Sequence, residues 1–235
     1  MEIAIGKNIL LNALDIVSKS IATKTTIQIL EGVLMEAKDK TLQLTGNNLE
    51  IAIQHTVECT VIEPGAVVVD FRLFQDIVRK LPDEEIDISA DDKSMTIEAG
   101  QAKMEISAMP AVNYPAIKEI DGGTSLEIDA KDFCGMVSGV SFAASQDESR
   151  PTLTAVCIEM KDDTLEVAAS DGFMLAVRKA ECSSGDFKLL LKAVDIDNVC
   201  RIFSQGKVRI KTDENSNIAL LENDSTKAAV RVIDG

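Results

Sequence analysis

Apolar residues recur with a helical period in two stretches of the first half of the chain. The first stretch predicts a helix with a single apolar face. That face holds Leu10, Leu14, Val17 and Ile21. The second stretch covers residues 71–81 and ends before Pro82, a residue that the interior of a helix does not accept. Its inward positions are Phe74, Ile77, Val78 and Leu81.

Apolar and polar residues alternate in most of the remaining segments, which is typical of strands with one buried face. A pair of strands is predicted within residues 33–44, split at the polar turn 38–40. Further strands are predicted within residues 51–61 and in the segments EIDISA, SMTIEA and KMEISAMP. Two helices with several mainly antiparallel strands indicate the α+β class.

This pattern occurs twice along the chain. VLMEAKDKTLQL (residues 33–44) and VCIEMKDDTLEV (residues 156–167) are identical at half of their positions, at an offset of about 123 residues. Residues 67–88 match residues 189–210 at nearly the same offset, and the first helix has a counterpart with Phe133, Val137 and Val140 on its apolar face. Duplication of a unit of about 120 residues explains the constant order and offset.

The duplication predicts two domains of one fold. The first is expected to span residues 1–120 and the second residues 126–235. The segment DGGTS (121–125) is the predicted linker, because a Gly-Gly pair among polar residues interrupts both helices and strands. Each domain is expected to pack two helices on about eight mainly antiparallel strands.

The formal net charge of −15 argues against a nucleic-acid-binding surface, unless the basic residues gather on one face. In the first domain the predicted helices and their flanks are locally basic, whereas acidic residues concentrate in turns and strand edges. Such a layer permits loose, sequence-independent contact with phosphates, although a solvated helix face is the simpler interpretation. The second domain weakens the pattern, because Asp195 and Asp197 accompany Arg201 there.

Little in the sequence would support catalysis. It has one histidine, His55, and five cysteines without a C-x-x-C pair, which disfavours a zinc site and a histidine-assisted nucleophile. Glycine-rich nucleotide loops and a G-x-S-x-G elbow are absent from the sequence. We therefore expect a protein that is not an enzyme and that needs no cofactor or metal. Without a long apolar run or a signal peptide, we expect a cytoplasmic location and no membrane contact.

Several segments follow one another in a familiar order: IQILEGVLMEAKDKTLQLTGNNLEIAI, EPGAVVVDFRLFQDIVRKLP, AMPAVNYPAI, DESRPTLTAVCIEM, AASDGFMLAVRKA and the closing RVIDG. Together they resemble the bacterial sliding clamp, the β subunit of DNA polymerase III. The resemblance covers the whole chain. It implies a DNA replication processivity factor that encircles duplex DNA, with the helices of each domain on the inner wall and the sheets outside.

The resemblance also implies phosphate contacts without sequence preference. Lys24 and Arg72 match basic residues of the family's DNA-contacting set, and Arg150 and Lys192 are looser matches. Contacts of this kind should weaken as salt rises.

A hydrophobic cleft is a further implication of the resemblance. It would capture short motifs of the DNA polymerase III α subunit, the clamp loader and other clamp-binding proteins. The half of the cleft from the second domain maps to Leu153, Ser170, Gly172, Phe173, Met174 and Leu175. The family pattern has Thr at position 170, and His or Tyr then Arg at positions 173 and 174, so this cleft would be more apolar and would prefer other partners. Core packing of Phe173 and Met174 is the alternative.

Family members carry three such domains, and two copies close a homodimeric ring. The third domain is absent from this chain, which we therefore expect to be a truncated form of a full-length parent protein. Met104 and Ile106 match the ring interface and should be exposed or paired otherwise without that domain. Two alternatives stay open: a complete two-domain clamp that forms a trimeric ring, and a partner-binding fragment that does not encircle DNA.

Overall fold

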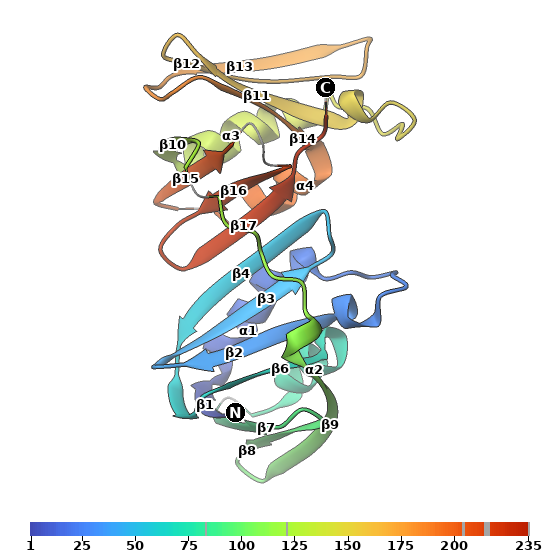
Figure 1. The fold of residues 1–235 in the computed structure, drawn as a ribbon, viewed down its shortest axis with the longest axis vertical. Coiled ribbons are helices and arrows are strands. Elements are labelled where there is room, and N and C mark those ends of the chain that lie inside the picture. Colours follow the sequence, from blue (N-terminus) through green and yellow to red (C-terminus); the bar gives the residue numbers. More distant parts are fainter. Residues whose placement is uncertain (83, 121, 204, 214–216, 235) are drawn as a thin grey trace. The chain divides into compact units, whose positions relative to one another are not determined.

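The computed structural model describes residues 1–82, 84–120, 122–203, 205–213 and 217–234 (Figure 1). The chain divides into two compact units, Met1–Ile117 and Lys118–Gly235. Within the segment expected to be a linker, Asp121 lies outside the described residues. Thr124 and Ser125 were also expected there, but they belong to a strand and pair with Thr212 and Lys211.

Unit 1 is α+β. Its helices are α1 (Lys7–Val17) and α2 (Phe71–Lys80). The strands found in its described residues are β1 (Glu2–Gly6), β2 (Gly32–Lys38), β3 (Thr41–Asn47), β4 (Ile51–Glu58), β5 (Thr60–Glu63), β6 (Gly65–Asp70), β7 (Glu85–Ala90), β8 (Ser94–Ala99) and β9 (Ala102–Pro110). They form an antiparallel sheet in the order β4-β3-β2-β6-β9-β8-β7-β1-β5. The predicted turn at 38–40 is confirmed, and Asp39 in it has a φ of 57°.

Unit 2 repeats this plan with two separate sheets. Its helices are α3 (Ala130–Ser141) and α4 (Ala193–Cys200). The strands are β10 (Thr124–Asp129), β11 (Ala155–Lys161), β12 (Thr164–Ser170), β13 (Leu175–Glu181), β14 (Phe187–Lys192), β15 (Lys207–Thr212), β16 (Ile218–Glu222) and β17 (Thr226–Arg231). One sheet has the order β10-β15-β16-β17 and the other β13-β12-β11-β14. A single bridge between Leu191 and Val232 stands where β6 and β9 pair in unit 1.

The predicted duplication is confirmed by the order of the elements. In each unit a strand leads directly into the first helix, a hairpin follows (β2–β3 or β11–β12), and another strand leads directly into the second helix. Three strands then complete each unit, β7 to β9 in unit 1 and β15 to β17 in unit 2. Strand β5 has no counterpart among the described residues of unit 2. The two units therefore share one architecture and differ at the sheet edge that β5 forms in unit 1.

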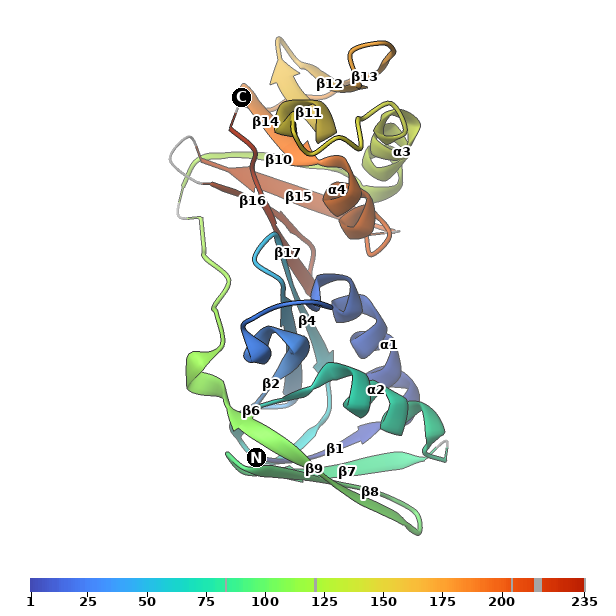
Figure 2. The same ribbon diagram turned by 90° about the vertical axis from the view of Figure 1, so that its right-hand side faces the viewer.

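In each unit the two helices lie beside each other along one side of the strands (Figures 1 and 2). Their apolar faces are buried: α1 buries Leu10 and α2 buries Phe74, whereas α3 buries Phe133 and α4 buries Ile196. These four residues occupy corresponding positions in the repeat, so the phenylalanine has moved from the second helix to the first. Volume-conserving exchanges of this kind are the ones that a packed core tolerates best.

Aspartates at two helix starts fix where the helices begin. The carboxylate of Asp70 accepts a hydrogen bond from the backbone N–H of Leu73 at 2.7 Å, and that of Asp129 accepts from Lys131 and Asp132. Such caps satisfy N–H groups that have no partner within the helix. Because each cap is the last residue of a strand, the first turn of the helix is held at the end of that strand.

Truncating Phe133 to alanine should destabilise unit 2. The side chain is fully buried, so Phe133→Ala removes its burial and leaves a cavity, at a cost of about 3–5 kcal/mol in the free energy of unfolding. Urea unfolding followed by circular dichroism measures this cost. Phe142→Ala serves as the control, because Phe142 is exposed and should change the midpoint little. Equal shifts in the two variants would contradict the assigned core.

Candidate partner cleft and DNA-facing residues

The six residues predicted to form half of a cleft come together in unit 2. Leu153 lies in a short 3-10 helix, η4 (Pro151–Thr154), which packs against β12. Ser170 is the last residue of β12 and Leu175 the first of β13, so residues 171–174 form the connecting turn. At Gly172 a Cβ atom would lie 4.0 Å from Leu153 Cδ1, which places the turn against η4.

Hydrogen bonds hold the 171–174 turn in one conformation. The carboxylate of Asp171 accepts from the backbone N–H groups of Met174 and Phe173, at 2.9 and 2.8 Å. These two bonds keep the pKa of Asp171 below its usual range. The hydroxyl of Ser170 donates to the carbonyl of Met174 at 2.7 Å and accepts from Gly172 N–H. Gly172 has a φ of +93°, a left-handed conformation that favours glycine.

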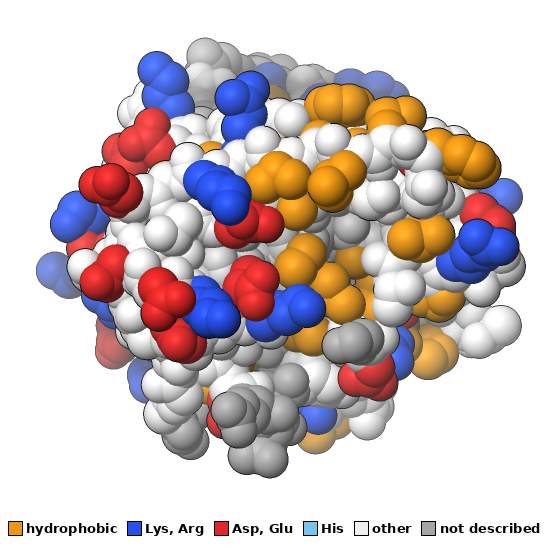
Figure 3. Space-filling view, turned by 90° about the horizontal axis from the view of Figure 1, so that it is seen from above, with side chains coloured by type: hydrophobic (Ala, Val, Ile, Leu, Met, Phe, Trp, Pro, Cys, Tyr) orange, Lys and Arg blue, Asp and Glu red, His pale blue; other side chains and the backbone are white. Residues whose placement is uncertain are grey.

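The turn presents apolar side chains to solvent. Phe173 is 99% exposed, and Met174, Leu175 and Val177 are exposed as well. Core packing of Phe173 is therefore wrong. Figure 3, a view onto unit 2, shows hydrophobic side chains gathered on one half of this face, with most of the charged side chains on the other half. Contiguous exposed apolar surface of this kind marks interaction sites on soluble proteins.

The predicted DNA-contacting residues of unit 1 are both exposed. Arg72 lies in the first turn of α2, two residues after the capping Asp70. Lys24 lies in the segment between the short helices η1 (Ser18–Ser20) and η2 (Gln28–Glu31). Among the ion pairs found between described residues, none involves either side chain. Both cations are thus open to solvent and to a ligand.

Other cations of the helical layer are engaged within the unit. Arg79 forms ion pairs with Asp15 at 3.3 Å and with Asp76 at 4.0 Å. The ammonium of Lys7 donates to the carbonyl of Leu81. The layer therefore has less open positive charge than the sequence predicted, and Lys24 and Arg72 contribute part of what is left.

The predicted DNA-contacting residues of unit 2 lie near one loop. Arg150 is exposed and precedes η4, and its backbone N–H donates to the carbonyl of Asp147. Lys192 forms an ion pair with Glu148 at 2.7 Å, and this pair keeps the pKa of Glu148 below its usual range. Part of the charge of Lys192 is thus balanced by an acidic residue that the sequence analysis did not single out.

Lys192 occupies an unusual position for a cation. It is the N-cap of α4 and makes no side-chain cap hydrogen bond there. A positive charge at the positive end of a helix is unfavourable, and the carboxylate of Glu148 offsets it. Lys192 also lines a hollow of about 350 Å³ together with the exposed apolar side chains of Phe142 and Val194. Phe142 and Val194 lie off the apolar faces of α3 and α4. That position was the signal in the sequence that could have identified them as exposed apolar residues.

The residues predicted for the ring interface are less accessible than expected. Ile106 is buried, with 8% of its surface exposed, and Met104 is half-buried. Both lie on β9, where Ile106 pairs with Met95 and Met104 with Ile97 of β8. They were expected to be exposed or paired otherwise, and Ile106 is not exposed, because the alternation of β9 turns it toward the interior of its own unit.

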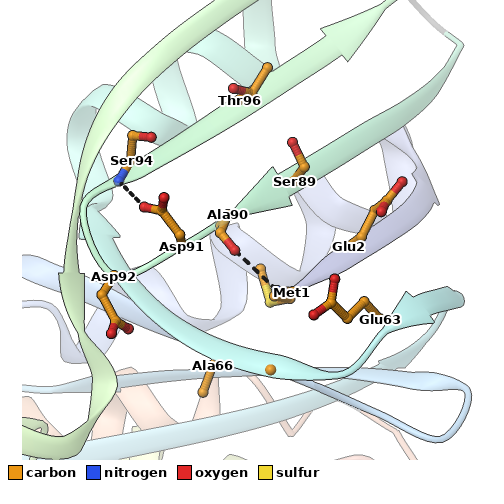
Figure 4. A pocket seen from close by; sticks show the side chains of 11 residues that line it. Met1, Glu2, Glu63, Ala66, Ser89, Ala90, Asp91, Asp92, Ser94 and Thr96 are labelled. Carbon is orange, nitrogen blue, oxygen red and sulfur yellow. Dashed lines mark hydrogen bonds between the residues drawn. The ribbon is translucent and has the colours of Figure 1, made fainter.

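A second hollow, of about 650 Å³, lies in unit 1, and none of the predicted site residues lines it (Figure 4). The acidic side chains of Glu2, Glu63, Asp91 and Asp92 line it, and the amino group of Met1 donates to the carbonyl of Ala90 at 3.0 Å. Its negative charge would repel DNA.

Within the described residues, no group of three or more His, Cys, Asp or Glu side chains is placed to hold a metal ion. A search of the same residues for a helix long and apolar enough to cross a membrane found none.

Comparison with known proteins identifies the family to which this architecture belongs. Duplicated units of helices on antiparallel sheets are the architecture of sliding clamps from Bacillus subtilis and Pseudomonas aeruginosa, so the chain has a DNA clamp fold. Residues 1–118 match the N-terminal domain of the DNA polymerase III beta subunit and residues 127–235 match its central domain. The chain belongs to the family of DNA polymerase III beta subunits.

Individual relatives agree with this assignment. The beta sliding clamp of Staphylococcus epidermidis is 28% identical over an alignment 246 residues long, which covers 100% of this chain and 65% of the relative. The crystal structure of the sliding clamp from Bacillus subtilis superposes with a TM-score of 0.95 at 25% identity. A Pseudomonas aeruginosa sliding clamp bound to griselimycin gives 0.94 at 25% identity. Each covers 100% of this chain, which spans 65% of either structure's length.

The ion pair at Lys192 predicts a pH-dependent contact. Because the pKa of Glu148 is lowered, the pair is complete at neutral pH and is lost as the pH falls through that lowered pKa. Replacing Lys192→Met should return the pKa of Glu148 to the ordinary range of a glutamate. A carboxyl-carbon NMR titration measures it, with Lys188→Met as the control on the same strand. The same pKa in both variants would exclude the pair in solution.

Proposed function

We propose that this chain forms the first two domains of a bacterial sliding clamp, a processivity factor of DNA replication. The clamp surrounds duplex DNA without sequence preference and tethers the replicative polymerase, and the chain itself has no catalytic role. The observation that favours this function is the combination of family membership with an ordered, exposed apolar turn at residues 171–174.

The DNA-facing role is assigned to the helical side of each unit. Lys24 and Arg72 supply open positive charge in unit 1. In unit 2 the assigned residues are Arg150 and Lys192, of which Lys192 is paired with Glu148. Contact through phosphates alone suits a protein that must move along any sequence, because phosphates carry no base information. The overall charge of −15 then keeps DNA away from the other surfaces.

The partner-binding role is assigned to the cleft residues of unit 2. A short linear motif from the polymerase α subunit, the clamp loader or another replication protein would place apolar side chains against Leu153, Phe173 and Leu175. The hydrogen-bonded turn supports this role, since a preformed site loses little conformational entropy on binding. Relatives with this architecture are clamps of the bacterial replication machinery, which favours a cytoplasmic location and a homodimeric ring in the intact parent protein.

Removing two open cations should weaken DNA binding. We expect Lys24→Ala with Arg72→Ala to lower duplex affinity about five- to tenfold at low salt, and to reduce the salt slope by about one to two units. Fluorescence anisotropy with a labelled duplex, repeated across a salt series, measures both. The control is Lys38→Ala with Lys40→Ala, which removes the same charge from the exposed β2–β3 turn. If both pairs behave alike, general charge rather than a DNA-facing surface governs binding.

Truncating the exposed aromatic of the turn should weaken partner binding. Phe173→Ala should reduce affinity for a peptide with an apolar clamp-binding motif about tenfold, as expected when an aromatic contact worth roughly 1–2 kcal/mol is lost. Isothermal titration calorimetry measures the affinity. Val112→Ala is the control, because Val112 is an exposed apolar residue of unit 1. Unchanged affinity in the Phe173 variant would remove this residue from the cleft.

A further inference from the structure

Two thiols meet between α3 and α4 in unit 2. Cys134 lies in the first half of α3 and Cys200 is the last residue of α4, and the two helices pack against each other. Each of the two side chains is the largest influence on the pKa of the other, which places the two thiols in contact. Cys134 also donates to the carbonyl of Phe203 at 3.3 Å, in the turn that follows α4. The two cysteines are therefore contributed by both helices, and the turn after α4 holds Cys134 in place.

The two thiols differ in environment. Cys200 is buried, whereas Cys134 is half-buried and more accessible to a small reagent. Contact with the Cys200 thiol lowers the pKa of Cys134, while the same contact and burial raise the pKa of Cys200. Cys134 is thus the sulfur more readily ionised, and a thiolate is the nucleophilic form of cysteine.

We propose that Cys134 and Cys200 are a redox pair, which hydrogen peroxide converts reversibly into a disulfide between α3 and α4. The Cys134 thiolate attacks one peroxide oxygen, so an S–O bond forms and the O–O bond breaks. The hydroxide that leaves combines with the proton that Cys134 has released, which gives the first water. The sulfur of Cys200 then attacks Cys134 Sγ, so the S–S bond forms and the S–O bond breaks. The departing hydroxide takes the proton of Cys200. Two thiols and one peroxide thus give one disulfide and two waters, and a reducing thiol reverses the change.

The remaining cysteines lack this arrangement. Cys59 belongs to unit 1, and burial raises the pKa values of Cys59 and Cys157. Contact between two thiols is found, within the described part of the chain, at Cys134 and Cys200. Oxidation should therefore be selective for this pair.

A bond at this place would constrain much of unit 2. The loop between the two cysteines contains about 65 residues and includes η4, β11, β12, β13 and β14. All the cleft residues, Arg150 and Lys192 lie within it. Closing such a loop reduces the entropy of the unfolded chain, so the oxidised form should be more resistant to unfolding.

Peroxide treatment of the full chain tests the pair. After stoichiometric hydrogen peroxide, denaturation and alkylation, two of the five thiols should be lost and mass spectrometry should find a peptide linked through Cys134 and Cys200. Dithiothreitol should restore both thiols. The oxidised chain should also unfold at a temperature higher by about 5 °C or more.

Conservative variants separate this pair from general oxidation. Cys134→Ser and Cys200→Ser should each abolish the linked peptide and the rise in unfolding temperature, whereas Cys157→Ser should retain both. Linkage through another cysteine, covalent dimers, or oxidation of Cys134 without linkage would overturn the proposal. The peptide map of the unsubstituted chain decides the matter even if a variant folds poorly.

Discussion

Burial of the apolar helix faces against the strands is the interaction on which the rest of this structure depends. Each helix follows a strand without an intervening loop, so the last strand residue sets where the helix starts. Once Leu10 and Phe74, or Phe133 and Ile196, are buried, the helix cannot rotate without exposing apolar surface. The first turn of each helix is thereby fixed in space, and with it side chains such as Arg72.

The duplication shows which features folding requires and which are free to differ. The elements recur in one order, yet corresponding positions carry different chemistry. Asp70 caps α2, whereas its counterpart Lys192 occupies the N-cap of α4 and forms an ion pair with Glu148. An aspartate would suit both helix starts. The lysine opposes local helix stability, and rules of this kind are broken mainly at functional positions.

The sequence was sufficient for the elements and for the repeat, because both depend on local periodicity and on offsets along the chain. The strands EIDISA, SMTIEA and KMEISAMP lie where predicted, as do both helices of unit 1, except that α1 ends at Val17, before the predicted Ile21. The sequence could not predict contacts between residues that lie far apart along the chain. Nothing local indicated that Glu148 reaches Lys192 or that Arg79 is held by Asp15, since each ion pair joins residues far apart along the chain.

Phe173 is the strongest sign that the turn of unit 2 serves more than folding. Burying a phenylalanine stabilises a protein by roughly 1.5–3 kcal/mol, and this residue is left outside. Disorder does not explain its exposure, because Asp171 accepts two backbone hydrogen bonds that hold the turn. A rigid turn that keeps an aromatic ring in water forgoes stability in the free protein. Contact with the proposed partner would recover that stability, because the ring would then be buried without any rearrangement of the backbone.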